Sequence, residues 1–142
     1  MTRLFAALVP VLVACPIACG GSSPMSPEAA VAHAGDRLRG SWVLAEYRSE
    51  EQLEPILASL LAAQIGRLTV VFDGENISAQ GVGVTAQRRY TIDNASADQF
   101  TATVVDPTGL KYGVTGNFQG PDLFFTSQTA PWRGTGRLRR AE

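Results

Sequence analysis

The chain has 142 residues, the size of one ordinary domain, and 45% of them are apolar, which excludes wholesale disorder. Twelve basic and thirteen acidic residues give a net charge of −1, so the chain lacks the large positive field that holds nucleic acids, and we expect no nucleic-acid partner. One histidine and two cysteines are too few for a zinc site or a multi-disulfide scaffold, and we expect neither a metal nor another cofactor.

The N-terminus has the pattern of an export signal. Arg3 is followed by an apolar run over residues 4–14, which is shorter than the roughly 20 residues that span a bilayer. The run leads into Leu12-Val13-Ala14-Cys15, which resembles the lipobox of bacterial lipoproteins, where the cysteine is acylated and becomes the new N-terminus. The alternative is an ordinary cleaved signal.

A second cysteine offers another acylation site. Pro16-Ile17-Ala18-Cys19 also ends in cysteine, but its proline stands where the lipobox has leucine, so Cys15 is favoured for the palmitate and Cys19 is the alternative. We therefore predict a lipoprotein signal peptide and lipobox region over residues 1–19. The resemblance implies an exported protein, lipid-anchored in the bacterial cell envelope. Because neither Pro16 nor Gly20 is aspartate, it implies the outer membrane.

Residues 20–36 are mostly Gly, Ser, Pro and Ala, and this composition predicts a flexible tether between the membrane and the domain. His33 lies near its end without a second histidine or a cysteine nearby, so we interpret it as a solvated residue rather than a metal ligand. The folded domain is expected over residues 37–142.

The first two elements of this domain differ in their hydrophobic period. Residues 38–47 alternate as a strand does, with Trp42 and Leu44 on one face. Residues 49–65 place apolar side chains on one stripe of a helix: Leu53, Ile56, Leu57, Leu60, Leu61 and Ile65. Ser49 is the expected N-cap, Pro55 must lie near the helix start, and Gly66 should end the helix. We expect this helix to cover one end of the core.

From residue 67 onward the pattern is that of strands joined by short turns. Asp73-Gly74 is a strong hairpin signal, and Asp106-Pro107-Thr108-Gly109 has good turn chemistry. The alternating segments lie at residues 68–72, 76–81, 84–92, 100–104, 110–118, 123–127 and 132–140. The sequence therefore predicts a mainly β fold: a meandering antiparallel eight-stranded barrel with one helix after the first strand.

Two ends of this pattern carry a family resemblance. Gly40-Ser41-Trp42 on the first strand and basic residues on the last strand resemble the calycin superfamily, and most closely the small bacterial lipocalin-like lipoproteins. In lipocalins this tryptophan packs at the closed end of the barrel, under an arginine from the last strand. The resemblance assigns Trp42 and Arg140 as a barrel-end plug, with Arg140 chosen because it shares a face with Leu138.

The chain departs from full lipocalins in three respects. It is shorter, its body has no disulfide, and its prominent helix follows the first strand, which is similar to fatty-acid-binding proteins. A second interpretation of the fold is the small β-rich domain of heat-shock-type lipoproteins, which also opens with Leu-x-Gly-x-Trp. Its usual Cys-Asn element is absent here.

One functional hypothesis is a non-enzymatic binder of a small hydrophobic or amphiphilic ligand. Strand parity places these residues on the barrel lining: Trp42, Leu44, Leu68, Val70, Phe72, Tyr90, Phe100 and Tyr112. Arg88 shares the face of Tyr90, where it would meet a carboxylate or phosphate head group. The alternative is that the aromatic residues fill the interior as a packed core.

The other hypothesis is a filled barrel that contacts another envelope protein or a cell-wall component. Trp132 and Arg133, within residues 129–134, are of the types enriched in binding hot spots. Catalysis is not expected, and we assign no catalytic residue. The only histidine lies in the linker, so no Ser/His/Asp or Cys/His set exists, and Gly81-Val82-Gly83 lacks the helix that a phosphate-binding loop needs.

Overall fold

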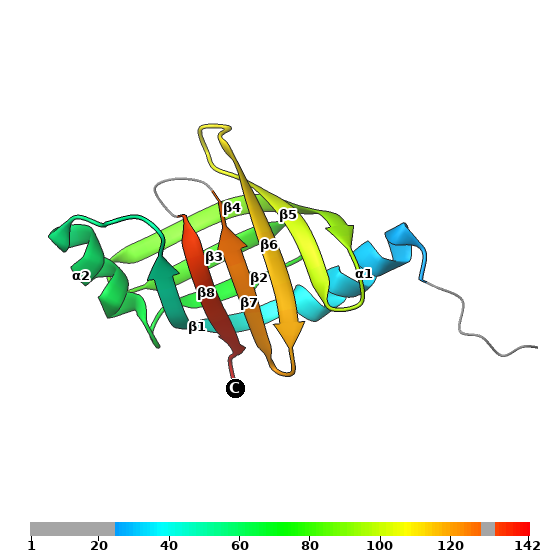
Figure 1. Cartoon of the computed structure of the whole chain (residues 1–142), viewed down its shortest axis with the longest axis horizontal. Helices are drawn as coiled ribbons and strands as arrows, with labels where there is room; N and C mark the ends of the chain where they lie inside the picture. The colour runs from blue at the N-terminus through cyan, green and yellow to red at the C-terminus, as the bar shows by residue number, and fades with distance from the viewer. Residues whose placement is uncertain (1–24, 129–132) are drawn as a thin grey trace, which may run out of the picture.

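The computed structural model describes residues 25–128 and 133–142. These residues form a closed antiparallel barrel of eight strands, in which each strand pairs with the next along the chain and the last pairs with the first (Figure 1). The predicted fold class and strand order are confirmed. The predicted signal region, with Cys15 and Cys19, lies outside the described residues.

Two helices accompany the barrel. In chain order the elements are α1 (Pro27–Leu38), β1 (Gly40–Ser49), α2 (Pro55–Gln64), β2 (Thr69–Phe72), β3 (Asn76–Gly81), β4 (Val84–Ala95), β5 (Gln99–Val105), β6 (Lys111–Gln119), β7 (Asp122–Ser127) and β8 (Gly134–Arg140). Figure 1 shows α1 and α2 at opposite ends of the barrel. We call these the α1 end and the α2 end.

Helix α1 corrects the prediction of a flexible tether over residues 20–36, which is wrong from Pro27 onward. The Ser26 hydroxyl accepts a hydrogen bond from the backbone N–H of Ala29 at 3.2 Å, and Pro27 occupies the first helical turn, so the helix has a regular N-cap. Ala30, Ala34 and Leu38 recur at four-residue spacing and form its buried face. Small alanines let the helix lie close to the barrel, where it packs on β4. His33 is exposed.

The helix after the first strand is present but begins at Pro55, six residues later than predicted. Ser49 is not its N-cap: it ends β1, and its hydroxyl accepts from the N–H of Glu51 at 3.2 Å. Proline disfavours the helical conformation in the residue before it, so a helix cannot easily run through Glu54 into Pro55. Gly66, with a φ of +76°, follows the end of the helix as expected.

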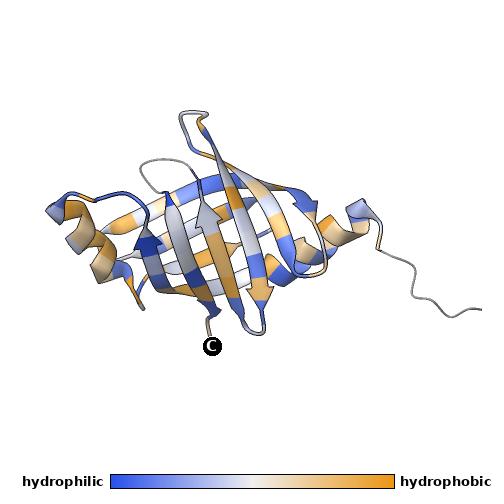
Figure 2. Ribbon diagram, viewed as in Figure 1, coloured by the Kyte–Doolittle hydropathy of each residue, from blue (hydrophilic) through white to orange (hydrophobic). Residues whose placement is uncertain are grey.

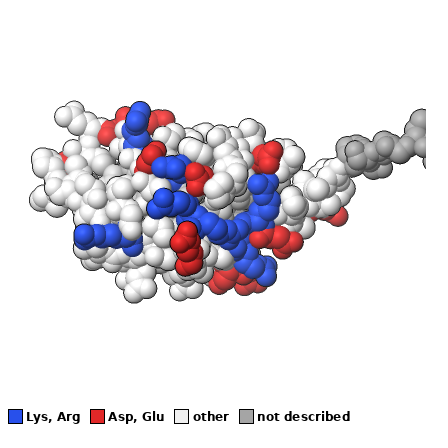
Figure 3. Space-filling view, turned by 90° about the horizontal axis from the view of Figure 1, so that it is seen from below, with Lys and Arg blue, Asp and Glu red and all other residues white. Residues whose placement is uncertain are grey.

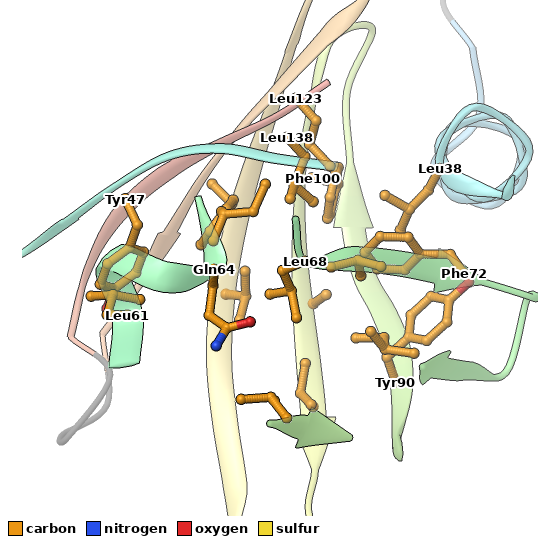
Figure 4. A pocket seen from close by; sticks show the side chains of 18 of the residues that line it. Leu38, Tyr47, Leu61, Gln64, Leu68, Phe72, Tyr90, Phe100, Leu123 and Leu138 are labelled. Atoms are coloured by element: carbon orange, nitrogen blue, oxygen red, sulfur yellow. The ribbon is translucent and has the colours of Figure 1, made fainter. Parts of the chain in front are cut away.

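A bulge in β1 changes which residues face inward. The register between β1 and β8 shifts between Leu44 and Glu46, so that Leu44 opposes Leu138 and Tyr47 opposes Gly136. Leu44 and Tyr47, three positions apart, therefore both line the interior of the barrel. Figure 4 shows Tyr47 among the side chains around the cavity. Simple alternation from Trp42 would have placed Tyr47 outside.

The longest strand, β4, extends beyond its neighbour. Its pairing with β5 begins at Arg89, opposite Val105, so residues 84–88 pair with β3 alone. These residues lie at the α2 end, beside the turn that follows β5. The wall of the barrel is therefore interrupted between the first half of β4 and that turn.

The polar surface carries mixed charge. On the face seen in Figure 3, Lys and Arg side chains are interleaved with Asp and Glu side chains. Arg137 on β8 illustrates this arrangement, because it bridges Glu46 of β1 at 2.7 Å and Asp122 of β7 at 3.2 Å. Helix α2 is different: it contains no charged residue, and Figure 2 shows it as hydrophobic along most of its length.

Candidate functional site

The α1 end of the barrel is closed by Trp42 and Arg140. The Trp42 side chain is 2% exposed, and its indole Nε1–H donates to the carbonyl oxygen of Leu38 at 2.7 Å. The Arg140 guanidinium lies 4.2 Å from the centroid of the Trp42 ring. The two residues are also direct partners in the register between β1 and β8. The contact between Trp42 and Arg140 that the family resemblance implied is therefore present.

Arg140 has a second role that the sequence did not indicate. Its Nη1 donates to the carbonyl oxygen of Arg39 at 2.7 Å, and its Nη2 donates to the carbonyl oxygen of Arg37. These oxygens lie at the C-terminal end of α1, where helical carbonyls lack partners within the helix. The last strand thus holds the first helix in place. Because α1 was not expected, this role could not be expected either.

A cavity of about 320 Å³ lies inside the barrel, between the closed α1 end and helix α2 (Figure 4). Six of the predicted lining residues do line it: Leu44, Leu68, Val70, Phe72, Tyr90 and Phe100. The alternative of a completely filled interior is wrong. In Figure 4 the lining extends from Leu38 of α1 at one end to Leu61 and Gln64 of α2 at the other.

Three residues predicted for the lining do not reach the cavity. Trp42 is not part of the lining, because it lies in the barrel-end plug at the α1 end. Arg88 and Tyr112 follow the inward alternation of their strands and are half-buried, but neither lines the cavity. The Tyr112 hydroxyl donates to Asp106 Oδ2 at 2.9 Å, and this hydrogen bond raises the pKa of Tyr112. Arg88 Nη1 donates to the neighbouring carbonyl oxygen of Gln87 at 2.8 Å.

Part of the lining, contributed by α2 and by further strand residues, was not predicted from the sequence. Helix α2 supplies Leu57, Leu60, Leu61 and Gln64, and Tyr47, Val114, Leu123, Phe125 and Leu138 come from strands. The apolar stripe on the helix did point to the α2 residues, since they are the side chains that were expected to cover the core. Tyr47 had no such signal because the bulge reverses its direction.

The lining includes no charged side chain. Its polar residues are Tyr47, Gln64 and Tyr90. The Tyr90 hydroxyl accepts from the N–H of Gly74 at 3.1 Å, in the turn at the α1 end, and burial raises the pKa of Tyr90. Burial likewise raises the pKa of Tyr47. A ligand in this cavity meets hydrocarbon on nearly all sides.

One side chain fixes α2 over the cavity. Gln64 is 4% exposed; its Nε2 donates to the carbonyl oxygens of Val82, at 2.7 Å, and Leu60, at 3.1 Å. Its Oε1 accepts from the N–H of Val82 at 3.0 Å. We call the paired bonds the Gln64–Val82 contact. A Cβ atom on Gly81 would overlap Gln64 Oε1, so glycine at this position lets the β3–β4 turn approach the helix.

The second predicted interaction element, residues 129–134, is described only from Arg133 onward, and Trp132 lies outside the described residues. Arg133 is exposed, and its Nε donates to the carbonyl oxygen of Gln128 at 3.2 Å. Among all the residues that the structure describes, no three or more His, Cys, Asp or Glu side chains are grouped so that they could hold a metal ion. Within residues 25–128 and 133–142, no helix has the length and apolar character needed to cross a membrane.

Comparisons with known proteins leave the site to be interpreted from its geometry. No protein-family model, no curated protein and no solved structure matches the chain.

Proposed function

We propose that the barrel binds a small molecule whose apolar part occupies the cavity. The observation that carries this proposal is the cavity itself, about 320 Å³ in volume and lined without charge. Ligand pockets have volumes of about 300–1,000 Å³, and an apolar cavity of about 150 Å³ already holds benzene. An apolar ligand that enters this cavity gains about 25 cal/mol for each Å² of its surface that is buried.

Fluorescence titration of the full chain with the neutral probe N-phenyl-1-naphthylamine tests this proposal. We expect saturable binding with enhanced emission. Ala102 lines the cavity from β5, so Ala102→Leu should fill part of it and weaken probe binding at least tenfold. Thr101→Leu, on the exposed face of the same strand, is the matched control and should bind as the original chain does. Probe binding that is equal in both variants would place the site elsewhere.

We also propose that the chain is a lipocalin-like lipoprotein of the calycin superfamily, non-catalytic and exported to the outer membrane. The support is the closed meandering barrel, the Trp42–Arg140 contact and the lipobox-like sequence before Cys15. Metabolic labelling with an alkyne analogue of palmitate in a bacterial host tests the anchor. The label should disappear in the Cys15→Ser variant and persist in the Cys19→Ser variant. The reverse pattern would assign Cys19 as the acylated residue. Absence of label from the original chain and from both variants would exclude acylation.

A second candidate function is contact with another envelope protein, and the exposed side of α2 favours it. Ile56, in the first turn of α2, is 80% exposed, and Ile65 and Val82, at the end of the helix, are also exposed. Large apolar side chains exposed along one element are a feature of interaction surfaces. A photo-crosslinking residue at position 56 should then give one adduct of defined mass in cells, whereas the same residue at position 87, on the exposed face of β4, should not.

A further inference from the structure

A groove of about 630 Å³ lies on the outer surface of β5, β6 and β7, on the other side of the barrel wall from the cavity. These three strands lie side by side (Figure 1), and the end of β4 completes the groove. We call it the β5–β7 groove. None of the described residues that line it is charged. Its polar lining residues all carry an amide or a hydroxyl group: Asn94, Ser96, Gln99, Thr101, Thr115, Asn117 and Thr126.

The strand register arranges the side chains of the groove in two rows. One row crosses four neighbouring strands and consists of Asn94, Thr101, Thr115 and Thr126. The other row, two residues farther along each strand, consists of Gln99, Asn117 and Phe124. Neighbouring strands are about 4.8 Å apart, so each row presents its groups at a nearly regular spacing. Beyond the groove, the first row continues to Thr135 of β8 and ends at Arg48 of β1.

The polar side chains of the groove form no hydrogen bond with other described residues. Thr103 provides a contrast on the same strand as Thr101, because its hydroxyl donates to Asp93 at 2.6 Å. A hydroxyl group and a carboxamide group can each both donate and accept. The β5–β7 groove therefore offers several unused donors and acceptors together to a ligand from outside.

Phe124 adds an aromatic ring to this polar surface. It lies directly opposite Asn117 in the β6–β7 register and is 37% exposed. The other aromatic side chains that the structure describes are buried or half-buried. An aromatic ring left exposed among neutral hydrogen-bonding groups can pack against a ligand that has both an apolar face and polar edges.

Charged side chains that flank the groove bind to one another. Asp98, in the turn between β4 and β5, is paired with Arg37 at 3.0 Å. Arg137, which opposes Phe124 in the β7–β8 register, bridges Glu46 and Asp122. A charged ligand in the groove would lose part of its hydration without meeting an opposite charge on the lining, and this desolvation is costly.

We infer that the β5–β7 groove binds a neutral oligosaccharide. A sugar hydroxyl both donates and accepts, as water does, so a sugar can replace the water on the amides and threonine hydroxyls without a loss of hydrogen bonds. Phe124 then packs against the C–H face of a sugar ring. A protein partner fits less well, because protein interfaces have an apolar core and Phe124 is the one large apolar side chain exposed in the groove.

Nuclear magnetic resonance of the isotope-labelled full chain tests this inference. The probes are three neutral hexasaccharides: cellohexaose, maltohexaose and N-acetylchitohexaose. We expect at least one of them to shift the backbone amide signals of β5, β6 and β7 in a saturable way and to leave those of β2 and β3 unchanged. Hexagalacturonate, which is negatively charged, should bind more weakly than that neutral probe.

Two variants in the groove are compared with two outside it. Phe124→Ala should weaken binding of the neutral probe at least tenfold, because an aromatic ring is no longer buried against it. Its matched control is Val71→Ala, since Val71 is 36% exposed on the outer face of β2. Asn117→Ala should weaken binding about fivefold, the effect of one hydrogen bond, whereas Gln80→Ala on the exposed face of β3 should not change it.

The amide spectrum shows whether each variant is folded, and binding of N-phenyl-1-naphthylamine is measured in parallel. That binding reports on the cavity and should be unchanged in Phe124→Ala, because the groove lies on the other side of the barrel wall. The oligosaccharide site and the proposed function can therefore fail independently of each other.

Four results would overturn the inference. If no neutral probe shifts the amides of β5, β6 and β7, the groove does not bind neutral sugars. If a probe binds equally to the original chain, Phe124→Ala and Asn117→Ala, its site lies elsewhere. If hexagalacturonate binds more tightly than every neutral probe, charge selects the ligand. If a photo-crosslinking residue at position 101 gives a protein adduct in cells while no probe binds, the partner is a protein.

Discussion

Arg140 links β8 to Trp42 and to the C-terminal end of α1. Arg140→Met keeps much of the aliphatic stem but removes the charge over Trp42 and the two bonds to α1 carbonyls. We expect the free energy of unfolding to fall by about 1–3 kcal/mol, measured by urea denaturation followed by tryptophan fluorescence. Arg139→Met, on the exposed outward face of β8, should cost less than about 0.5 kcal/mol. Equal losses would show that the Trp42 contact is not stabilising.

Asp106 gives the stability of the β5–β6 turn a defined pH dependence. Hydrogen bonds from the Thr108 hydroxyl, and then from Tyr112 and the Leu110 and Thr108 amides, lower the pKa of Asp106 from 3.8 to about 2. A carboxyl group whose pKa is lower in the folded state stabilises that state above pH 3.8, and this contribution is lost as the pH falls through about 2.

The measurement is the urea midpoint of the original chain and of Asp106→Ala between pH 2 and pH 7. We expect the variant to be less stable at pH 5–7, and the gap to narrow as the pH approaches 2. Asp93→Ala is a control for the loss of an exposed carboxylate that accepts a hydrogen bond from the Thr103 hydroxyl at 2.6 Å. A gap that stays constant across this range would mean that the charge of Asp106 does not contribute.

Strand alternation predicts side-chain direction correctly where no bulge or distant partner intervenes. Trp42, Leu44 and Leu138 were placed inward from the period of two, and the structure places them so. Gln64 was missed for a physical reason: its partner, Val82, is 18 residues away, and only the folded turn brings the two together. The sequence presents Gln64 as an ordinary polar residue at the end of a leucine-rich helix.

At the scale of the element, α2 depends on the Gln64–Val82 contact more than on burial, because Gln64 is its only buried residue. Gln64→Leu removes three hydrogen bonds while keeping a side chain of similar size. We expect a loss of about 1 kcal/mol in global stability, since water can solvate the exposed Val82 backbone, and a larger loss of amide-exchange protection within α2. Gln80→Leu, exposed on β3, is the control. Unchanged exchange in α2 would contradict this role.

The two helices show where composition misleads. Small residues are shared by flexible linkers and by helices that pack closely, so Ala29, Ala30, Ala32 and Ala34 fit either interpretation. What decides for a helix is the Ser26–Pro27 start and a barrel surface against which the alanines pack, and that surface exists only in the folded protein. Helix α2 begins at Pro55 and not after Ser49, because proline restricts the residue before it more strongly than a serine N-cap favours a helix start.

At the scale of the whole molecule, closure of the ring can be tested with a disulfide. Val43 and Arg139 face outward and oppose each other in the β1–β8 register. In a chain with Cys15→Ser and Cys19→Ser, we expect Val43→Cys/Arg139→Cys to form an intramolecular disulfide that raises the urea midpoint. Thr69→Cys/Arg139→Cys is the matched control, because Thr69 lies one strand farther away. Its cysteines are separated by about two strand spacings, roughly 10 Å, which is too far for a bond.

The strand order followed from the short turns in the sequence, and the closed ring followed from the Trp42–Arg140 pairing that the family resemblance implied. The cavity did not follow. Its volume depends on how far α2 stands from the barrel and on the direction of Tyr47, and these are determined by the β3–β4 turn and the β1 bulge. Strand alternation predicts which side chains point into the barrel, but it does not predict whether those side chains fill the interior or leave a cavity.

The pairing of β1 with β8 also determines when the protein can be completed. A nascent chain that ends before Gly134 has an unpaired edge on β1 and no guanidinium for Trp42 or for the carbonyls of α1. The ring therefore forms only after β8 has emerged, and truncation within β8 leaves a sheet with open edges that can pair with other chains. A stop codon within β8 should consequently prevent closure of the ring even though seven of the eight strands have been made.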